Sequence, residues 1–305
     1  MAIVVFGSIN MDLVVRTPRF ARPGETLTGH TFYTSPGGKG ANQAVAAARL
    51  GAPTWMIGRV GGDMFGDALL VSLQASGVHT DAVLKDPSQP SGTALITVDD
   101  RAENNIIIVP GANGQVGEAD LERMHQVLTL CGILLLQLET PMPGVIAAAQ
   151  LARQHGLQVI LDPAPALPLP DELYRSIDWI TPNESEAALL AGFAVTDEVA
   201  ARQAASVLHQ RGVPNVVIKM GGRGALWSGP EGVQLLPAFP VQPVDTVAAG
   251  DAFNGALAAG LESGFSPADA LRRACAVGAI STTRPGAQPS MPTLSELEDF
   301  LTAYG

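Results

Sequence analysis

The sequence has 305 residues, of which 47% are hydrophobic and 15% charged, and its formal net charge is −11 at pH 7. Globular domains usually contain about 25% charged residues, so this composition excludes a disordered chain, and the length allows a large buried core. The excess of acidic residues argues against nucleic acid as a partner, because phosphate backbones are bound by clustered cations.

The chain contains only two cysteines, Cys131 and Cys275, which excludes a disulfide framework and a cysteine-rich metal site. Its apolar start, Met1–Phe6, has no cationic stretch before it and stops at Gly7, unlike a signal peptide. No apolar run approaches the roughly 18–20 residues that a membrane span requires. We therefore expect a soluble, cytoplasmic protein with no membrane partner.

Short β-branched and apolar runs alternate along the chain with alanine-rich segments of helical length. The expected strands are Ile3–Phe6, Met56–Val60, Ile133–Leu138, Val159–Leu161 and Val216–Ile218. The expected helices are Ala41–Leu50, Phe65–Ala75, Gly144–Gln154, Ala252–Leu261 and Pro267–Thr283. Continuous apolar strands separated by helices are typical of a parallel sheet buried on both faces. We predict an α/β fold with three layers, α/β/α, around a mostly parallel central sheet.

Two stretches, within residues 12–37 and 91–110, contain strand-like pieces but no good helix. In the second, Thr93–Val98 and Asn105–Val109 flank the polar segment Asp99–Asn104, which predicts a hairpin with a longer loop. We interpret both stretches as one small antiparallel β-sheet that lies over an edge of the main layer as a lid. Residues 1–305 then form a single domain into which this lid is inserted.

The segment Gly37-Gly-Lys-Gly-Ala-Asn-Gln43 opens the first long helix. Its glycines let backbone N–H groups approach a ligand, and a helix N-terminus favours oxygen-rich groups. It is not a P-loop, because Gly40 rather than Ser or Thr follows Lys39, and it lacks the third glycine of a dinucleotide-binding turn. A simple tight turn is the alternative, but Asn42 beside Lys39 favours a polar ligand.

The segment Asp245-Thr-Val-Ala-Ala-Gly-Asp251 precedes another helix. Small residues at positions 248–250 permit a tight turn whose N–H groups converge as the helix starts, which makes an anion cradle. Asp251 falls in the first helical turn, where a carboxylate is favoured electrostatically. An ordinary helix cap is the alternative, but a cap needs no cradle just upstream, so we favour a functional role.

Asn183 and Glu186 follow an apolar segment and lie three positions apart. Their oxygens suit Mg²⁺ held through waters and phosphate oxygens, although a capping box explains the same spacing equally well. The strand Val216–Ile218 runs into a glycine turn that ends at Gly224. Ligands usually bind at the carboxyl ends of such strands, and a plain hairpin turn is the alternative.

Asn10, Asp12 and Glu139 also follow predicted strands, where their side chains could hold sugar hydroxyls; each is individually also explained as a loop or capping residue. The histidines show no ligand spacing, and we expect them at the surface. They are His30, His79, His125, His155 and His209.

Five segments together resemble the ribokinase family of sugar kinases, in matching order and over essentially the whole chain. They are Gly7-Ser-Ile-Asn-Met-Asp12, Gly37-Gly-Lys-Gly-Ala-Asn-Gln-Ala44, Thr181-Pro-Asn-Glu-Ser-Glu186, Asp245-Thr-Val-Ala-Ala-Gly-Asp251 and Gly286-Ala-Gln-Pro-Ser290. The resemblance implies the ribokinase-like fold and transfer of a phosphoryl group from ATP to the 5-hydroxyl of D-ribose, giving D-ribose 5-phosphate and ADP.

The resemblance also implies a role for each matching position. Asp251 would be the catalytic base, and the N–H groups of Ala248, Ala249 and Gly250 would form an anion hole. The sugar would be held by Asn10, Met11, Asp12, Gly38, Lys39, Gly40, Ala41, Asn42, Glu139 and Asp251. ATP would lie along Asn183, Lys219, Met220, Gly221, Gly222, Arg223, Gly224, Gly250, Asp251 and Cys275. Lys219 stands where the family often has Thr, and Cys275 replaces a more usual polar residue.

Two ions and a second subunit are implied in the same way. Mg²⁺ would be held near Asn183 and Glu186 through water. A K⁺ loop, acting mostly through carbonyl oxygens, falls on Asp245, Val247, Ser281, Arg284, Gly286 and Ser290. The exposed strand edges of the lid favour a homodimer built through the lids. The alternatives are a kinase for deoxyribose, a nucleoside or a ketohexose, and a catalytically silent sugar-binding regulator on the same fold.

Overall fold

The computed structural model of the chain describes residues 1–101 and 103–304. Nine strands of this part of the chain form the main sheet, in which β13, β14 and β15 pair antiparallel and all other neighbours pair parallel. In spatial order they are β15 (Gly232–Leu236), β14 (Ala225–Gly229), β13 (Asn215–Lys219), β12 (Trp179–Ile180), β11 (Gln158–Leu161), β10 (Cys131–Leu136), β1 (Ala2–Phe6), β4 (Thr54–Ile57) and β6 (Val78–His79).

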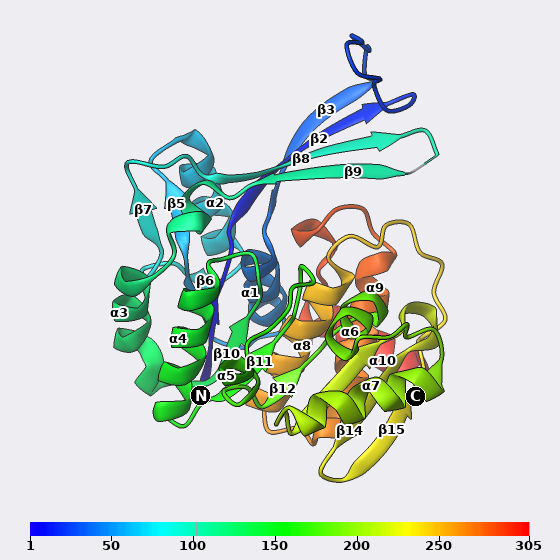
Figure 1. The fold of residues 1–305 in the computed structure, drawn as a ribbon. Helices are drawn as coiled ribbons and strands as arrows, with labels where there is room; N and C mark the ends of the chain where they lie inside the picture. Colours follow the sequence, from blue (N-terminus) through cyan, green and yellow to red (C-terminus); the bar gives the residue numbers. More distant parts are fainter. Residues whose placement is uncertain (102, 305) are drawn as a thin grey trace.

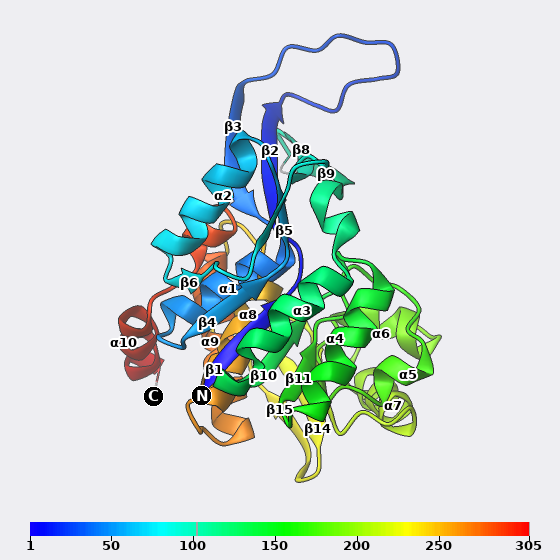
Figure 2. The same cartoon turned by 90° about the vertical axis from the view of Figure 1, so that its left-hand side faces the viewer.

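The first strand, β1, shows why this sheet is buried on both faces. Ile3 and Val5 pack into one apolar cluster, whereas Val4 and Phe6 pack into another. Because successive side chains of a strand point to opposite faces, a continuous apolar run supplies a core on each side. Helices cover both faces (Figures 1 and 2), so the predicted three-layer arrangement with a mostly parallel sheet is confirmed.

The helices divide between the two clusters. The cluster of Ile3 and Val5 receives side chains from α1 (Lys39–Arg49), α2 (Met64–Ala75), α8 (Ala249–Glu262), α9 (Pro267–Thr282) and α10 (Leu294–Tyr304). The other cluster receives them from α3 (Glu118–Val127), α4 (Met142–Gln154), α5 (Asp171–Tyr174), α6 (Glu184–Ala191) and α7 (Glu198–Gln210). Every predicted helix is present, with ends shifted by a few residues. In the described part of the chain, none is long and apolar enough to cross a membrane.

A second, four-stranded sheet projects from one end of the main body (Figure 1). Its strands, in spatial order, are β3 (Thr31–Gly37), β2 (Asn10–Thr17), β8 (Gly92–Asp99) and β9 (Asn104–Val109). The two outer pairs are antiparallel, whereas β2 and β8 run parallel. The predicted hairpin is confirmed, since Thr93 pairs with Val109. The predicted loop between its strands includes Ala102, which lies outside the described residues.

The predicted strand Met56–Val60 is wrong as a single element. The strand β4 ends at Ile57, and β5 (Arg59–Gly61) leaves the main sheet to pair with β7 (Leu84–Asp86). Gly58 lies at the break, where a Cβ would come within 2.5 Å of the Gly7 carbonyl oxygen. The close approach of β1 therefore turns the chain at this point, and apolar patterning alone does not reveal it.

The expectation that the histidines lie at the surface is wrong for one of them. His209 is half-buried, and its ring nitrogens lie 2.8 Å from the Val213 carbonyl oxygen and 2.8 Å from Ser228 Oγ. It joins the end of α7 to β14 of the main sheet.

The carboxyl ends of the parallel strands meet at one edge of the main sheet. The polar residues Glu139, Asp162 and Asn183 follow β10, β11 and β12 at this edge, and Lys219 is the last residue of β13. Strand β2 of the small sheet follows β1 closely, and β3 leads directly into α1. Ligands bind at this edge in open α/β sheets, and short connections of the chain place the small sheet next to it.

Helices α1 and α8 pack closely because Gly255 of α8 has no side chain where the two helices meet. A Cβ on Gly255 would lie 2.6 Å from both the Gln43 carbonyl oxygen and Ala46 Cβ. The absence of this atom lets the two helices approach until Asn42 and Gln43 of α1 reach the first turn of α8.

Candidate active site

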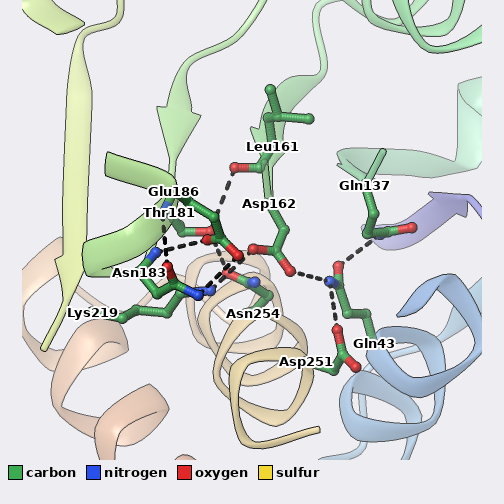
Figure 3. Close-up of polar contacts among 10 residues, drawn as sticks. All are labelled: Gln43, Gln137, Leu161, Asp162, Thr181, Asn183, Glu186, Lys219, Asp251 and Asn254. Carbon is green, nitrogen blue, oxygen red and sulfur yellow. Dashed lines mark hydrogen bonds and ion pairs between the residues drawn. The ribbon is translucent and has the colours of Figure 1, made fainter. Parts of the chain in front are cut away.

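Asp251 lies in the first turn of α8 and is 5% exposed. Its Oδ2 accepts a hydrogen bond from Asn42 Nδ2 at 2.9 Å. Its Oδ1 accepts one from Gln43 Nε2 at 3.2 Å, which Figure 3 shows. Burial raises the pKa of Asp251, an effect that the Lys39 ammonium opposes and the Asp162 carboxylate reinforces. A buried carboxylate with a raised pKa, held in place by two amides, is suited to act as a general base.

The predicted anion cradle directly precedes this carboxylate. Ala248 adopts a left-handed conformation with φ 59°, which lets the chain turn sharply into α8. The N–H groups of Gly250 and Asp251 donate to no described residue, whereas that of Ala249 donates to the Thr246 carbonyl oxygen at 3.3 Å. Free N–H groups at a helix start favour an anion, so the turn can hold a phosphoryl group beside Asp251.

The predicted sugar residues gather between the small sheet and α1. Asn10 is buried, and its Oδ1 accepts from Asn113 Nδ2 at 2.7 Å, which leaves its own amide nitrogen to donate. Glu139 accepts hydrogen bonds from Ser8 Oγ and from the Lys39 N–H. A Cβ on Gly37 would come within 2.4 Å of the Asp12 carboxylate, so that glycine leaves room for it.

Carboxylates dominate the charge of this region. Burial, and then repulsion from Glu139 and Asp251, raises the pKa of Asp12 from 3.8 to about 7. Burial by itself would lower the pKa of Lys39, but attraction to the surrounding carboxylates, Asp251 foremost, outweighs it and raises that pKa. The Lys39 ammonium is therefore firmly charged and offsets part of the negative charge.

Some predicted sugar residues can act only through their backbone. The side chains of Met11 and Ala41 are buried in the apolar core. Gly38 has a φ of 90°, a conformation that favours glycine. A Cβ on Gly40 would come within 2.7 Å of the Ser8 backbone nitrogen. These residues shape the start of α1 rather than present side chains to a ligand.

The predicted nucleotide loop follows β13. Gly221 and Gly222 have open space where a Cβ would be, so the backbone there is accessible to a flat or extended ligand. Gly224 fits against the backbone of residues 236–238, and these residues and Cys275 line a hollow of ≈ 400 Å³. Burial raises the pKa of the Cys275 thiol to about 12, which makes it an apolar wall rather than a nucleophile. The guanidinium of Arg223 pairs with Glu184 at the surface.

Asn183 and Glu186 form a capping box at the start of α6. Asn183 Oδ1 accepts from the Glu186 N–H at 2.9 Å, and the Glu186 carboxylate accepts from both nitrogens of Asn183. In the described residues, no three His, Cys, Asp or Glu side chains gather as direct metal ligands do. Each Glu186 oxygen keeps lone pairs for a water molecule, so the pair fits Mg²⁺ held through waters and phosphates but not a fully ligated site.

Asp245 joins the segment before α8 to the segment after α9. Its Oδ1 accepts from the Val247 N–H at 3.0 Å and its Oδ2 from the Gly286 N–H at 2.9 Å. Ser281 and Ser290 turn their hydroxyls to local carbonyls, and Arg284 points to Glu296. These contacts bring the two segments of the predicted K⁺ loop together. A loop with a single carboxylate fits a large monovalent cation better than Mg²⁺, which demands a compact octahedron.

Several buried polar residues of the site went unnoticed in the sequence. Asn113 fixes Asn10, and Gln137 donates to Gln43, which contacts two carboxylates. Asp162 directly follows β11, so the rule that singled out Asn10 and Glu139 would have found it. Asn113 follows the predicted strand Asn105–Val109, which belongs to the lid and not to the main sheet, so only the tertiary structure reveals its contact with Asn10.

Residues 2–294 match the family model described as pfkB family carbohydrate kinase. The chain belongs to this family. The predicted resemblance to ribokinase-like sugar kinases is thereby confirmed.

Individual members of the pfkB family are similar to this chain over almost its full length. A ribokinase of Haemophilus influenzae is 43% identical over 299 residues, covering 98% of each chain. A deoxyribokinase of Salmonella typhi is 38% identical over 303 residues, covering 99% of each. The structure of Arabidopsis thaliana ribokinase complexed with ribose and ATP matches with a TM-score of 0.93 at 35% identity, covering 99% of both chains.

Proposed function

We propose that this pfkB-family kinase transfers the γ-phosphoryl group of ATP to the 5-hydroxyl of D-ribose, giving D-ribose 5-phosphate and ADP. The observation that carries the proposal is the buried carboxylate of Asp251 beside the unpaired N–H groups of Gly250 and Asp251. A base next to an anion cradle is what phosphoryl transfer to an alcohol requires. The ribokinase relatives, one of them complexed with ribose and ATP, support these substrates.

In this mechanism Asp251 accepts the proton of the attacking hydroxyl, and the cradle N–H groups stabilise negative charge on the transferring phosphoryl group. One such donor typically contributes about 10²–10³ in rate. Asp12 and Glu139 accept hydrogen bonds from the sugar, and Asn10, with its carbonyl oxygen occupied by Asn113, donates one. The small sheet excludes water, whose attack would waste ATP.

Two cations complete the proposed mechanism. Glu186 and Asn183 would hold Mg²⁺ through waters, and the ion would neutralise charge on the ATP phosphates. Asp245, with carbonyl oxygens near Val247 and Gly286, would hold K⁺. This second ion would order the turn that precedes Asp251 without touching either substrate.

A coupled assay of ADP release over a panel of sugars, with and without K⁺, tests the proposed function. We expect the highest kcat/KM with ribose and a higher rate in K⁺ than in its absence. Deoxyribose is the second candidate, because a deoxyribokinase is 38% identical to the chain. Release with fructose or adenosine equal to that with ribose would contradict the assignment. An equal rate without K⁺ would contradict the proposed K⁺ site and leave the kinase assignment standing.

We also propose that the chain is a single kinase domain whose lid, residues 12–37 and 91–110, closes over the sugar. Limited proteolysis of the hairpin of β8 and β9 tests this closure, and we expect ribose with an ATP analogue to slow cleavage. The proposal also places the enzyme in the cytoplasm, where ATP is available, and cell fractionation tests this location.

Sugar binding should weaken as the pH falls through about 7. The pKa of Asp12 is about 7, so its carboxyl is mostly protonated below that pH and mostly ionised above it. Only the ionised form accepts hydroxyl hydrogen bonds on both oxygens, and ribose therefore favours it. We expect KM for ribose, measured from about pH 5.5 to 8.5, to rise on the acid side. Asp12→Asn should give a higher but flat KM, and a flat wild-type profile would contradict the prediction.

We further propose that the enzyme is a homodimer joined through the small sheets. All six residues of β9 are exposed, and four of them are the apolar run Ile106–Val109. An exposed apolar edge strand needs a cover. Sedimentation should show a dimer for the wild type and a monomer for Ile107→Glu. The control is Val199→Glu on α7, which should stay dimeric; the side chains of Ile107 and Val199 are both 65% exposed. A monomeric wild type would contradict the proposal.

A further inference from the structure

Asp162 is a buried carboxylate to which the proposed mechanism gives no role. It directly follows β11 at the active edge of the sheet and is 2% exposed. Its Oδ1 accepts a hydrogen bond from the Lys219 ammonium at 3.0 Å, and its Oδ2 accepts one from Gln43 Nε2 at 3.0 Å (Figure 3). Each oxygen thus has its own donor, and the two donors come from different elements.

The amide of Gln43 links Asp162 to the proposed base. Gln43 Oε1 accepts from Gln137 Nε2 at 2.7 Å, so the amide nitrogen of Gln43 must face the opposite way. That nitrogen donates to both Asp162 Oδ2 and Asp251 Oδ1. The two carboxylates therefore share one amide group, and a turn of that group away from both would leave Asp251 held by Asn42 alone.

The other oxygen of Asp162 holds Lys219 at the cradle. The Lys219 side chain is 15% exposed and reaches from the end of β13 towards the start of α8. A Cβ built on Gly250 would lie 3.3 Å from the Lys219 ammonium nitrogen. The ammonium therefore stands beside the backbone whose free N–H groups form the cradle.

The site is rich in carboxylates, so an ammonium group beside the cradle offsets negative charge there. In the described part of the chain, five carboxylates lie close enough to shift the pKa values of their neighbours in a connected series, and two ammonium groups lie among them. They are Asp12, Glu139, Asp162, Glu186 and Asp251, with Lys39 and Lys219. The phosphates of ATP add further negative charge, so a cation fixed beside the cradle lowers the cost of bringing them to Asp251.

We propose that Asp162 is a positioning residue for phosphoryl transfer, which holds the Lys219 ammonium at the cradle with one oxygen and, through Gln43, orients the Asp251 carboxylate with the other. Lys219 then contacts the terminal phosphates of the nucleotide. This role rests on the proposed function and adds to it the residue that couples base and phosphate.

The substitution Asp162→Asn tests the proposal because it keeps the shape but leaves one acceptor oxygen. If that oxygen faces Lys219, the new NH₂ group meets the NH₂ group of Gln43 and turns it away from Asp251. If it faces Gln43, the NH₂ group meets the ammonium. We expect kcat to fall about 10- to 100-fold, the range expected for a misplaced reacting group, while the Kd for ribose measured by calorimetry changes less than about twofold.

The second substitution, Lys219→Met, removes the phosphate contact but leaves the contact of Asp162 with Gln43, so it separates the effect on the phosphates from the effect on Asp251. It should lower kcat about tenfold and weaken ATP binding while leaving AMP binding unchanged, because the lost contact is with the terminal phosphates. The double variant should restore the contact with Gln43, since the Asn oxygen is then free to face it. The kcat of the double variant should lie within about threefold of the kcat of Lys219→Met alone. It should therefore be far higher than the kcat expected if the losses of the two single variants multiplied.

Two matched controls are available. Asp178→Asn changes a carboxylate that accepts from the Val159 N–H at the opposite end of β11, and Lys85→Met removes an exposed lysine paired with Asp67. Both should leave kcat and the Kd for ribose unchanged.

Three results would overturn the proposal: an unchanged kcat in Asp162→Asn, single effects that multiply in the double variant, or equal losses of ATP and AMP binding in Lys219→Met. If Asp162→Asn does not fold, the nucleotide series with Lys219→Met still decides the phosphate contact. A wild-type enzyme without sugar kinase activity would instead refute the proposed function, while the nucleotide titrations would still report on Lys219.

Discussion

Replacing Asp251 with Asn should lower kcat by at least about 10², the usual contribution of a well-placed general base. The amide has nearly the same shape but cannot accept the hydroxyl proton. Ribose binding should remain measurable, because Asn10, Asp12 and Glu139 are untouched. Steady-state kinetics together with calorimetric titration of ribose measures both quantities.

Thermal unfolding of the same variant separates loss of chemistry from loss of structure. Burial raises the pKa of Asp251, so its charged form costs stability at neutral pH, and a neutral amide removes that cost. The new NH₂ group, however, faces the NH₂ group of Asn42 or of Gln43, so the two effects oppose each other and we expect only a small change in the midpoint. Asp67→Asn is the matched control, because Asp67 also lies in the first turn of a helix but is exposed. A near-normal kcat in Asp251→Asn would show that another group takes the proton.

Adding one methyl group at Gly255 should both destabilise the protein and impair turnover. Helix propensity alone predicts that Gly255→Ala stabilises α8 by up to about 1 kcal/mol. The new Cβ would, however, lie 2.6 Å from the Gln43 carbonyl oxygen, and overpacking of this kind typically costs about 1–3 kcal/mol. We therefore expect a lower free energy of unfolding, measured by urea titration.

The same shift should reach the chemistry, because Asn42 and Gln43 sit on the helix that must move. We expect kcat to fall by at least about tenfold. The control is Gly132→Ala in β10, where the atoms nearest a new Cβ belong to the Met1 side chain at 3.4 Å. A Gly255→Ala variant that is more stable than the wild type and fully active would show that α1 and α8 tolerate a wider spacing.

In the small sheet, the local sequence pattern predicts some strand pairs but not others. The hairpin of β8 and β9 could be predicted, because its two apolar strands flank a polar loop and contact each other locally. The parallel pairing of β2 with β8 could not, since these strands lie far apart in the chain and only the packed fold brings them together. The same limit explains the break at Gly58, which depends on the proximity of Gly7.

The candidate site divides in a similar way. Asp251 could be predicted because a carboxylate in a first helical turn after small residues is a local feature. Asn183 and Glu186 stayed ambiguous in the sequence, and the structure shows a capping box that is compatible with a water-held ion. Gln43 lay within a noticed motif, yet its role depends on Asp162, Gln137 and Asp251, which come from three other parts of the chain.

The sequence by itself determined the layered α/β fold, the family and the position of the proposed base, because periodicity, glycine turns and helix starts depend on neighbouring residues. Only the tertiary structure decided which buried groups share hydrogen bonds, such as Asp162 with Lys219 and Asn10 with Asn113. The physical reason is that a buried polar group must find its partner in space. Where the strands end at one sheet edge, that partner is brought close by packing and not by distance along the chain.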